Sequence, residues 1–181
     1  MKRLQRAAFL TELVEQMRDQ GSWCGETHVQ KAAFLIEKLF GVDLGYDFIL
    51  YRHGPFSFDL RDELQGFASD RLIRYEPQAP PYGPRISVTQ HGQSIQETYP
   101  QTLRRHADAI RFVAEKIDAR GVVNLERLAT ALYVTLENSA APEQERTRML
   151  RLLKPHISEP AALQAVREID EIRAEAEALA A

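Results

Sequence analysis

Residues 48–59 read FILYRHGPFSFD, and this stretch decides the expected fold. Its first four residues are β-prone and predict a short strand. Gly54 and Pro55 follow, and they indicate a turn, because glycine adopts backbone conformations that other residues resist and proline fixes the direction of the chain. Ser57 stands where the N-cap of a helix would lie. We therefore expect Gly54, Pro55 and Ser57 to form a structural turn that joins a strand to a helix.

Amphipathic helices are expected on both sides of this stretch, since apolar residues recur there with the spacing of a helix face. Helices are predicted over residues 2–20, 27–40 and 58–70. Thr27, with Gln30 three residues later, has the pattern of a capping box and predicts the start of the second helix. The third helix should bury Leu60, Leu64 and Phe67 against Val29, Ala33 and Ile36 of the second.

Two further β-prone runs, 72–76 and 85–88, enclose a tip that contains four prolines. Proline cannot donate to a β-ladder, so the tip 77–84 should be a stiff loop. Thr89 can cap a helix over residues 90–98. The order helix, strand, tip, strand, helix is typical of a winged helix-turn-helix.

The second half of the chain has the pattern of helices only, and Pro100 marks a soft boundary. Asn124 is a candidate N-cap, and Pro142 and Pro160 are candidates for the first turn of helices. The sequence thus predicts a mostly α protein. A winged helix-turn-helix-like lobe with a small β-wing (1–100) should pack against a helical lobe (101–181) as one compact unit.

Composition favours a cytoplasmic protein. The chain has 181 residues, a formal net charge of −3 and one cysteine, Cys24. A single cysteine excludes an internal disulfide and fits a reducing compartment. The sequence shows no readable secretory signal and no apolar run long enough for a membrane span, so no membrane association is expected.

Two segments resemble known bacterial families. Residues 30–36 (QKAAFLI) and 45–57 (GYDFILYRHGPFS) resemble the YwgA-like group of small bacterial proteins. More distantly, they are similar to the Panacea (SocA-like) antitoxin domain and to the C-terminal domain of DarG-type antitoxins. A second patch, 125–133 with 152–156, resembles the helical second half of YwgA-like proteins. The matching positions of the first segment are Lys31, Tyr51, Gly54, Pro55, Ser57 and Leu60. The resemblance implies a toxin-neutralising or regulatory, non-enzymatic role.

Candidate partner-binding residues are basic and lie at the elbow and in the wing: Arg52, His53, Arg71, Arg74 and Arg85. For the elbow pair Arg52-His53, we favour a local role, in which the two side chains cap the next helix or pair with Asp59, because loop charges are usually solvated or locally paired. Tyr51 beside them is expected in the core, with its hydroxyl at the edge.

The charge of helix 58–70 weighs against DNA. It holds one basic residue, Arg61, against four acidic ones, and phosphate contacts are made chiefly by Lys and Arg. We therefore favour a non-catalytic regulator or antitoxin-like protein that binds a protein partner, such as a toxin or defence protein. The alternative is a winged-helix transcription regulator that binds DNA as a dimer, and homodimer formation is open in either case.

No catalytic, cofactor or metal site is predicted. Cys24 and His28, with Glu26 between them, offer two good metal ligands where three or four are needed. Phosphate-binding loops, dinucleotide fingerprints and nucleophile elbows have no match in the sequence. An unrecognised enzyme is the third and weakest hypothesis.

Overall fold

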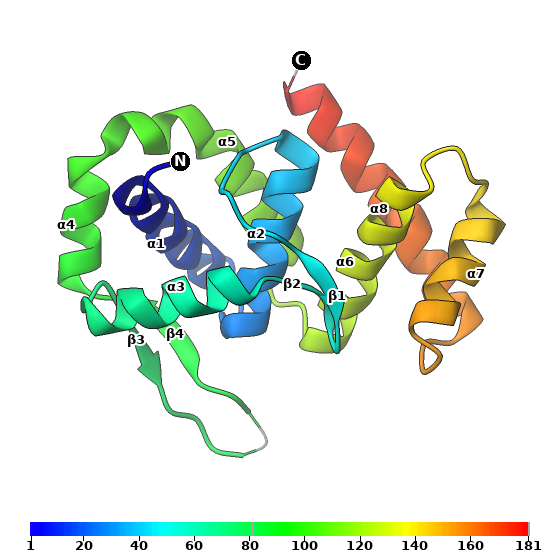
Figure 1. Cartoon of the computed structure of the whole chain (residues 1–181), viewed down its shortest axis with the longest axis horizontal. Helices are drawn as coiled ribbons and strands as arrows, with labels where there is room; N and C mark the ends of the chain where they lie inside the picture. The colour runs from blue at the N-terminus through cyan, green and yellow to red at the C-terminus, as the bar shows by residue number, and fades with distance from the viewer. Residues whose placement is uncertain (81, 181) are drawn as a thin grey trace.

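The computed structural model describes residues 1–80 and 82–180, and in this part of the chain it has eight helices and two β-hairpins (Figure 1). The predicted mostly α fold with a small β-wing is confirmed. In chain order the elements are α1 (Arg3–Asp19), α2 (Glu26–Phe40), β1 (Ile49–Tyr51), β2 (Gly54–Phe56), α3 (Phe58–Ser69), β3 (Ile73–Glu76), β4 (Arg85–Val88), α4 (Gln90–Thr98), α5 (Pro100–Ile117), α6 (Val122–Glu137), α7 (Glu143–Leu153) and α8 (Glu159–Ala180).

The apolar face of α3 is buried as the sequence predicted. Leu60, Leu64 and Phe67 are each at most 1 % exposed, and they belong to the same core as the inward residues of α2. Helix α3 contacts both α2 and β3. Burial of a large apolar side chain stabilises by about 1.5–3 kcal/mol, so this stripe fixes α3 in place.

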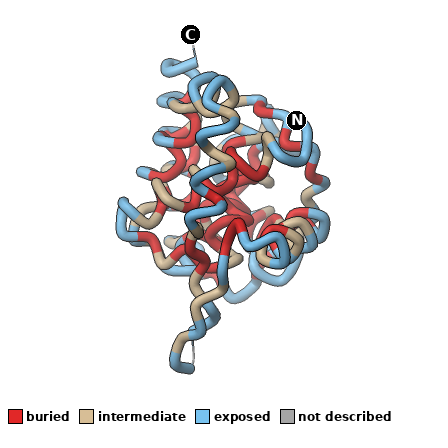
Figure 2. The backbone as a smooth tube through the Cα atoms, turned by 90° about the vertical axis from the view of Figure 1, so that its left-hand side faces the viewer, coloured by how far each residue is buried: buried red, intermediate tan, exposed pale blue. Residues whose placement is uncertain are grey.

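The wing is the antiparallel pair β3–β4, with Ile73 opposite Val88 and Glu76 opposite Arg85. It is attached to the rest of the protein along β4, and the Tyr82 ring in its tip packs on Trp23 with centroids 4.8 Å apart. In β4, Ile86 N–H donates to Cys24 O at 2.8 Å, and Arg18 donates to Ile86 O at 3.0 Å. The far end leaves the body of the molecule, and its surface is mostly exposed (Figure 2). Pro81 of the predicted stiff tip lies outside the described residues.

The two predicted lobes share one hydrophobic core. Helix α5 packs on α1 and α2, α6 packs on α2 and β2, and α7 and α8 pack on α6. The cluster of buried apolar residues therefore continues across Pro100 without a break. In the described residues, none of the helices has the length and apolar content needed to cross a membrane.

Several helices begin at other residues than the sequence predicted. Thr89 does cap α4, since its hydroxyl accepts from Gly92 N at 3.1 Å. However, Gly121 rather than Asn124 is the N-cap of α6, and Pro142 is itself the N-cap of α7. The first turn of α6 is exposed, and water can satisfy exposed N–H groups there, so no side-chain cap is required.

Candidate functional site

The stretch 48–59 builds the β1–β2 hairpin and the start of α3. β1 and β2 pair antiparallel, and Arg52-His53 form the two-residue turn between them. The sequence placed the turn at Gly54-Pro55, but these two residues open β2. Proline is accepted in this strand because Pro55 faces Leu50 in a pair that needs no N–H from it.

Gly54 has the unusual backbone that the sequence predicted. Its φ is +85°, in the region that favours glycine. A Cβ at this position would lie 2.9 Å from Oγ1 of Thr130 and 3.4 Å from the carbonyl oxygen of Glu126, both on α6. Gly54 therefore allows the hairpin to approach α6 more closely than any side chain would permit.

Two buried side chains of α2 hold the chain that leaves the hairpin. Ser57 caps α3 as predicted, and its hydroxyl accepts from Leu60 N at 3.3 Å. The Gln30 amide donates to Ser57 O at 2.8 Å and accepts from Ser57 N at 2.9 Å. Lys31 donates to Pro55 O at 2.7 Å. The capping box predicted from Thr27 and Gln30 is wrong, because Gln30 is engaged with Ser57 and α2 begins after Gly25.

The turn of the hairpin is held from the other half of the chain. Lys154, in the connection from α7 to α8, donates to Tyr51 O at 2.9 Å and to Arg52 O, and its Nζ lies 3.0 Å from Oε1 of Glu126. We call Lys31, Glu126, Thr130 and Lys154 the hairpin anchor. Each of the four is at most 5 % exposed.

The hairpin anchor buries two ammonium groups against one carboxylate. Burial lowers the pKa of Lys31 to about 8, the nearby Glu126 carboxylate opposes this, and the Lys154 ammonium adds to it. A buried charge is costly unless it is paired and hydrogen-bonded. Lys154 meets this requirement through its ion pair with Glu126 and its bonds to Tyr51 O and Arg52 O. Lys31 donates to Pro55 O and has the Glu126 carboxylate nearby. Moving the hairpin would therefore remove hydrogen bonds from both buried ammonium groups.

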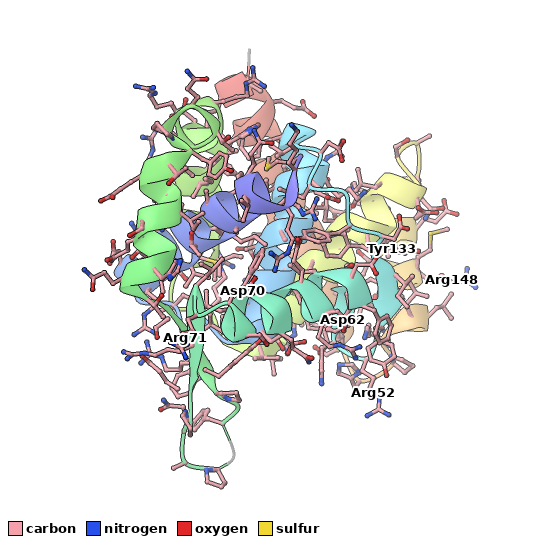
Figure 3. All side chains as sticks on the ribbon, turned by 60° about the vertical axis from the view of Figure 1, so that its left-hand side comes forward. Arg52, Asp62, Asp70, Arg71, Tyr133 and Arg148 are labelled. Carbon is pink, nitrogen blue, oxygen red and sulfur yellow. The ribbon has the colours of Figure 1, made fainter. Side chains whose placement is uncertain are left out.

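The elbow residues Arg52 and His53 lie outside the anchor. His53 Nδ1 is 3.6 Å from Oε2 of Glu126, and His156 Nε2 is 3.5 Å from Oε1 of the same carboxylate; both imidazoles are mostly exposed. His53 thus lies beside Glu126 rather than capping α3 or pairing with Asp59. Arg52 points into solvent (Figure 3), with its guanidinium carbon 6.0 Å from the centre of the Tyr51 ring.

An apolar surface lies on the solvent side of the hairpin. It consists of Ile49, Tyr51, Phe56 and Phe58, which we call the hairpin surface. The three rings contact one another with centroids 5.2–5.7 Å apart. Ile49, Tyr51 and Phe58 remain 49 %, 43 % and 40 % exposed. The prediction that Tyr51 lies in the core is wrong, because Tyr51 and Ile49 alternate with the inward Leu50 along β1.

The three wing arginines lie apart from the elbow. Arg71 is exposed at the end of α3, with a φ of +59° (Figure 3). Arg74 donates to Ser87 Oγ at 3.0 Å and to Glu76 at 3.2 Å. Arg85 donates to Trp23 O at 3.1 Å and covers the Trp23 ring. The five predicted partner-binding residues therefore form two separate groups, and two of the wing arginines are engaged within the protein.

The acidic residues of α3 divide into an inner and an outer set. Glu63 accepts two bonds of 2.8 Å from Arg6, and Asp70 pairs with Arg3 at 2.5 Å. These two pairs attach α3 to α1. Asp59 and Asp62 face solvent, so the outer surface of α3 keeps a negative charge.

Cys24 and His28 are buried separately from the hairpin. Burial raises the pKa of the Cys24 thiol to about 12, which disfavours the reactive thiolate. His28 Nε2 lies 3.2 Å from Arg120 O, and burial lowers the pKa of its imidazole. Among residues 1–80 and 82–180, no three metal-ligating side chains converge.

Sequence reasoning missed the roles of Glu126, Thr130 and Lys154. All three lie in the second half of the chain, within residues 125–133 and 152–156, while Lys31 and Gly54 lie in the first half. The structure brings these two distant parts of the chain together around the hairpin. Periodicity alone shows only that Glu126 and Thr130 lie on a helix, so it could not have identified these roles.

A comparison of the chain with protein-family models finds no match, and neither does a comparison with curated proteins.

Proposed function

We propose that this protein is a non-catalytic bacterial regulator, antitoxin-like in character, that acts by binding a protein partner through the hairpin surface. The observation that carries this proposal is the exposure of Ile49 and Tyr51 on a hairpin held by buried charged groups, next to the exposed Phe58 at the start of α3. Exposed apolar patches with a polar rim often mark protein-binding sites.

The composition of the hairpin surface supports a protein as the partner. Aromatic residues and arginine are enriched among the residues that dominate protein interfaces. Here Arg61 lies 4.9 Å from the centre of the Phe58 ring, and Arg52 lies over Tyr51. Because the anchor fixes the backbone beneath these side chains, binding requires little ordering of the hairpin, which favours affinity.

DNA binding as a winged-helix dimer is the second candidate, and the formed wing favours it. Against it, the helix that would enter the major groove presents Asp59 and Asp62 to solvent, and Arg74 and Arg85 are engaged. An anisotropy titration with random duplex DNA at physiological salt should show weak or no binding. Sub-micromolar affinity with a steep salt dependence would favour DNA instead, with Arg71 as the first contact to replace.

An enzyme has the least support. The charged groups of the anchor are occupied with backbone carbonyls of the hairpin and with one another. Their geometry is that of a structural support.

Photo-crosslinking in the host cell tests the proposal. Tyr51 is replaced by p-benzoylphenylalanine, and the matched control carries the same residue at Tyr82, which is 63 % exposed in the wing. We expect a discrete protein adduct at position 51 and not at position 82. Phe58→Asp and Arg52→Ala should reduce this adduct without changing the melting temperature by more than about 2 °C. Adducts at position 82 alone, or at neither position, would contradict the proposal.

A further inference from the structure

Helix α7 carries an apolar side chain on its outer face. The helix buries Arg146, Thr147 and Leu150 against the rest of the protein. Because a helix has about 3.6 residues per turn, Leu152 lies on the opposite side from these three. Leu152 is 70 % exposed, more than any other large apolar side chain of the described residues. Removing such a side chain from water is favourable, so Leu152 is a candidate contact for another chain.

An apolar groove lies beside Leu152, between α6 and α7. It has a volume of about 190 Å³, and its apolar wall consists of Tyr133, Val134, Met149, Leu152 and Leu153. Glu137 and Asn138, where α6 ends, are its polar residues. A cavity of about 150 Å³ with apolar walls holds a molecule as large as benzene. The groove therefore has room for one leucine side chain.

The charged residues at the groove have both signs. Glu137 lines it on α6, and Arg148 stands on α7 one turn before Leu152. Both side chains are exposed, and Arg148 projects into solvent (Figure 3). In the described part of the chain neither forms an ion pair, whereas the next arginine of α7, Arg151, is bound to Glu159. The surface therefore complements a partner that also presents one acid and one base.

We propose that a second copy of the chain covers this surface, in a two-fold symmetric dimer in which Leu152 of each protomer enters the α6–α7 groove of the other. A two-fold interface uses the same patch on both subunits, so the patch must complement itself. Here it holds a projecting leucine with a groove of matching size, and an acid with a base. Glu137 of one protomer pairs with Arg148 of its partner, and this pair occurs twice. The inference goes beyond the proposed function and does not depend on it.

The size of the surface sets the expected affinity. The contact involves two helices of each protomer, and interfaces that bury less than about 1,200 Å² in total belong to weak, transient complexes. We therefore expect a dissociation constant on the order of 10–100 µM. A purely acidic or purely basic ligand would meet one like charge at the groove, whereas a second copy meets only opposite charges.

Sedimentation equilibrium of the full chain tests the inference. The average mass should rise from that of one chain at about 1 µM toward that of two chains at about 500 µM. Leu152→Asp alters an exposed side chain, so the fold should be retained. It should weaken association by about tenfold or more, equivalent to 1.4 kcal/mol. Leu179→Asp, at a 45 % exposed leucine of α8, is the matched control and should dimerise like the wild-type protein.

Exchanging the charges tests the geometry of the dimer. Glu137→Arg and Arg148→Glu each turn two attractive pairs into two repulsive ones, so each variant alone should associate about tenfold more weakly. Mixed in equal amounts, the two variants should form a heterodimer, because each introduced charge then faces its opposite. The double variant should dimerise like the wild-type protein for the same reason.

Three outcomes would overturn the inference. The first is a protein that stays monomeric up to about 500 µM, which would leave the groove to a different chain. The second is association that Leu152→Asp does not weaken; its loss in Phe58→Asp instead would assign the contact to the hairpin surface. The third is a mixture of Glu137→Arg and Arg148→Glu that associates no better than either variant alone.

Discussion

The two β-hairpins of this protein differ in how they are held. The β1–β2 hairpin receives hydrogen bonds from Lys31 in the first half of the chain and from Lys154 in the second half, and both ammonium groups are buried. The β3–β4 wing is attached to α1 and to the connection before α2, by backbone bonds, by surface ion pairs and by the packing of Tyr82 on Trp23, but by no buried ammonium group. One hairpin bridges the two halves, while the other projects from one of them (Figure 1).

This difference separates two kinds of exposed surface. Tyr51 and Tyr82 are both exposed tyrosines, but Tyr51 stands on a backbone fixed by buried charges and Tyr82 lies in the wing tip. Binding to a surface whose backbone is already fixed loses less conformational entropy than binding to one that must first be ordered. The bridging hairpin is therefore the better platform for a partner, and the predictions below test whether it is held as strongly as the contacts indicate.

The largest effect is expected from Gly54→Val. Valine would be strained at a φ of +85°, and its Cβ would lie 2.9 Å from Thr130 Oγ1. Strain and overpacking together should cost about 4 kcal/mol of unfolding free energy, measured by urea denaturation. The matched variant is Gly83→Val in the wing tip, where nothing lies within 4 Å of a Cβ, and its cost should stay below about 0.5 kcal/mol. Equal losses would show that the two hairpins are equally constrained.

Glu126→Gln should have the next largest effect. It leaves the buried Lys31 and Lys154 without their carboxylate, and breaking a buried ion pair costs about 3 kcal/mol or more. In the wing, Glu76→Gln removes the carboxylate that pairs with Arg74 and Arg18 nearer the surface, and its cost should be below about 1 kcal/mol. Calorimetric unfolding of both variants measures the two losses of stability. A larger loss in Glu76→Gln than in Glu126→Gln would contradict the prediction.

A smaller effect should appear in the pH dependence of stability. The pKa of Lys31 is about 8 in the folded protein and 10.5 in a free lysine. Between these values the unfolded chain binds more protons, so folding stability rises with pH. Relative to Lys31→Met, the wild-type protein should gain roughly 2 kcal/mol as pH increases from 8 to 10.5. The unfolding free energies of the wild-type protein and of Lys31→Met are measured by denaturation across this pH range. If both depend on pH in the same way, the Lys31 ammonium lies in a water-like environment and the prediction is wrong.

The sequence predicted the elements well, because helix periodicity and turn residues act locally. The buried stripe of α3, the Ser57 cap, the Gly54 backbone and the wing all follow from such local patterns. The hairpin anchor could not be predicted from the sequence, because the proximity of Lys31 to Glu126 and Lys154 depends on tertiary packing. Tyr51 was misplaced for a related reason: alternation along a strand does not show which face is covered. Gln30 was assigned to a helix cap, although its tertiary bond to Ser57 decides its role.

Native-state hydrogen exchange of the two hairpins tests the central claim most directly. The amides of Gly54 and Phe56 belong to the bonded pairs of β1–β2, and those of Glu76 and Arg85 to the outermost pair of the wing. We predict that Gly54 and Phe56 exchange only when the whole protein unfolds, whereas Glu76 and Arg85 exchange through local opening. In Glu126→Gln, the protection of Gly54 and Phe56 should fall while that of the wing is unchanged. Exchange of Gly54 and Phe56 as fast as that of the wing amides would contradict the account.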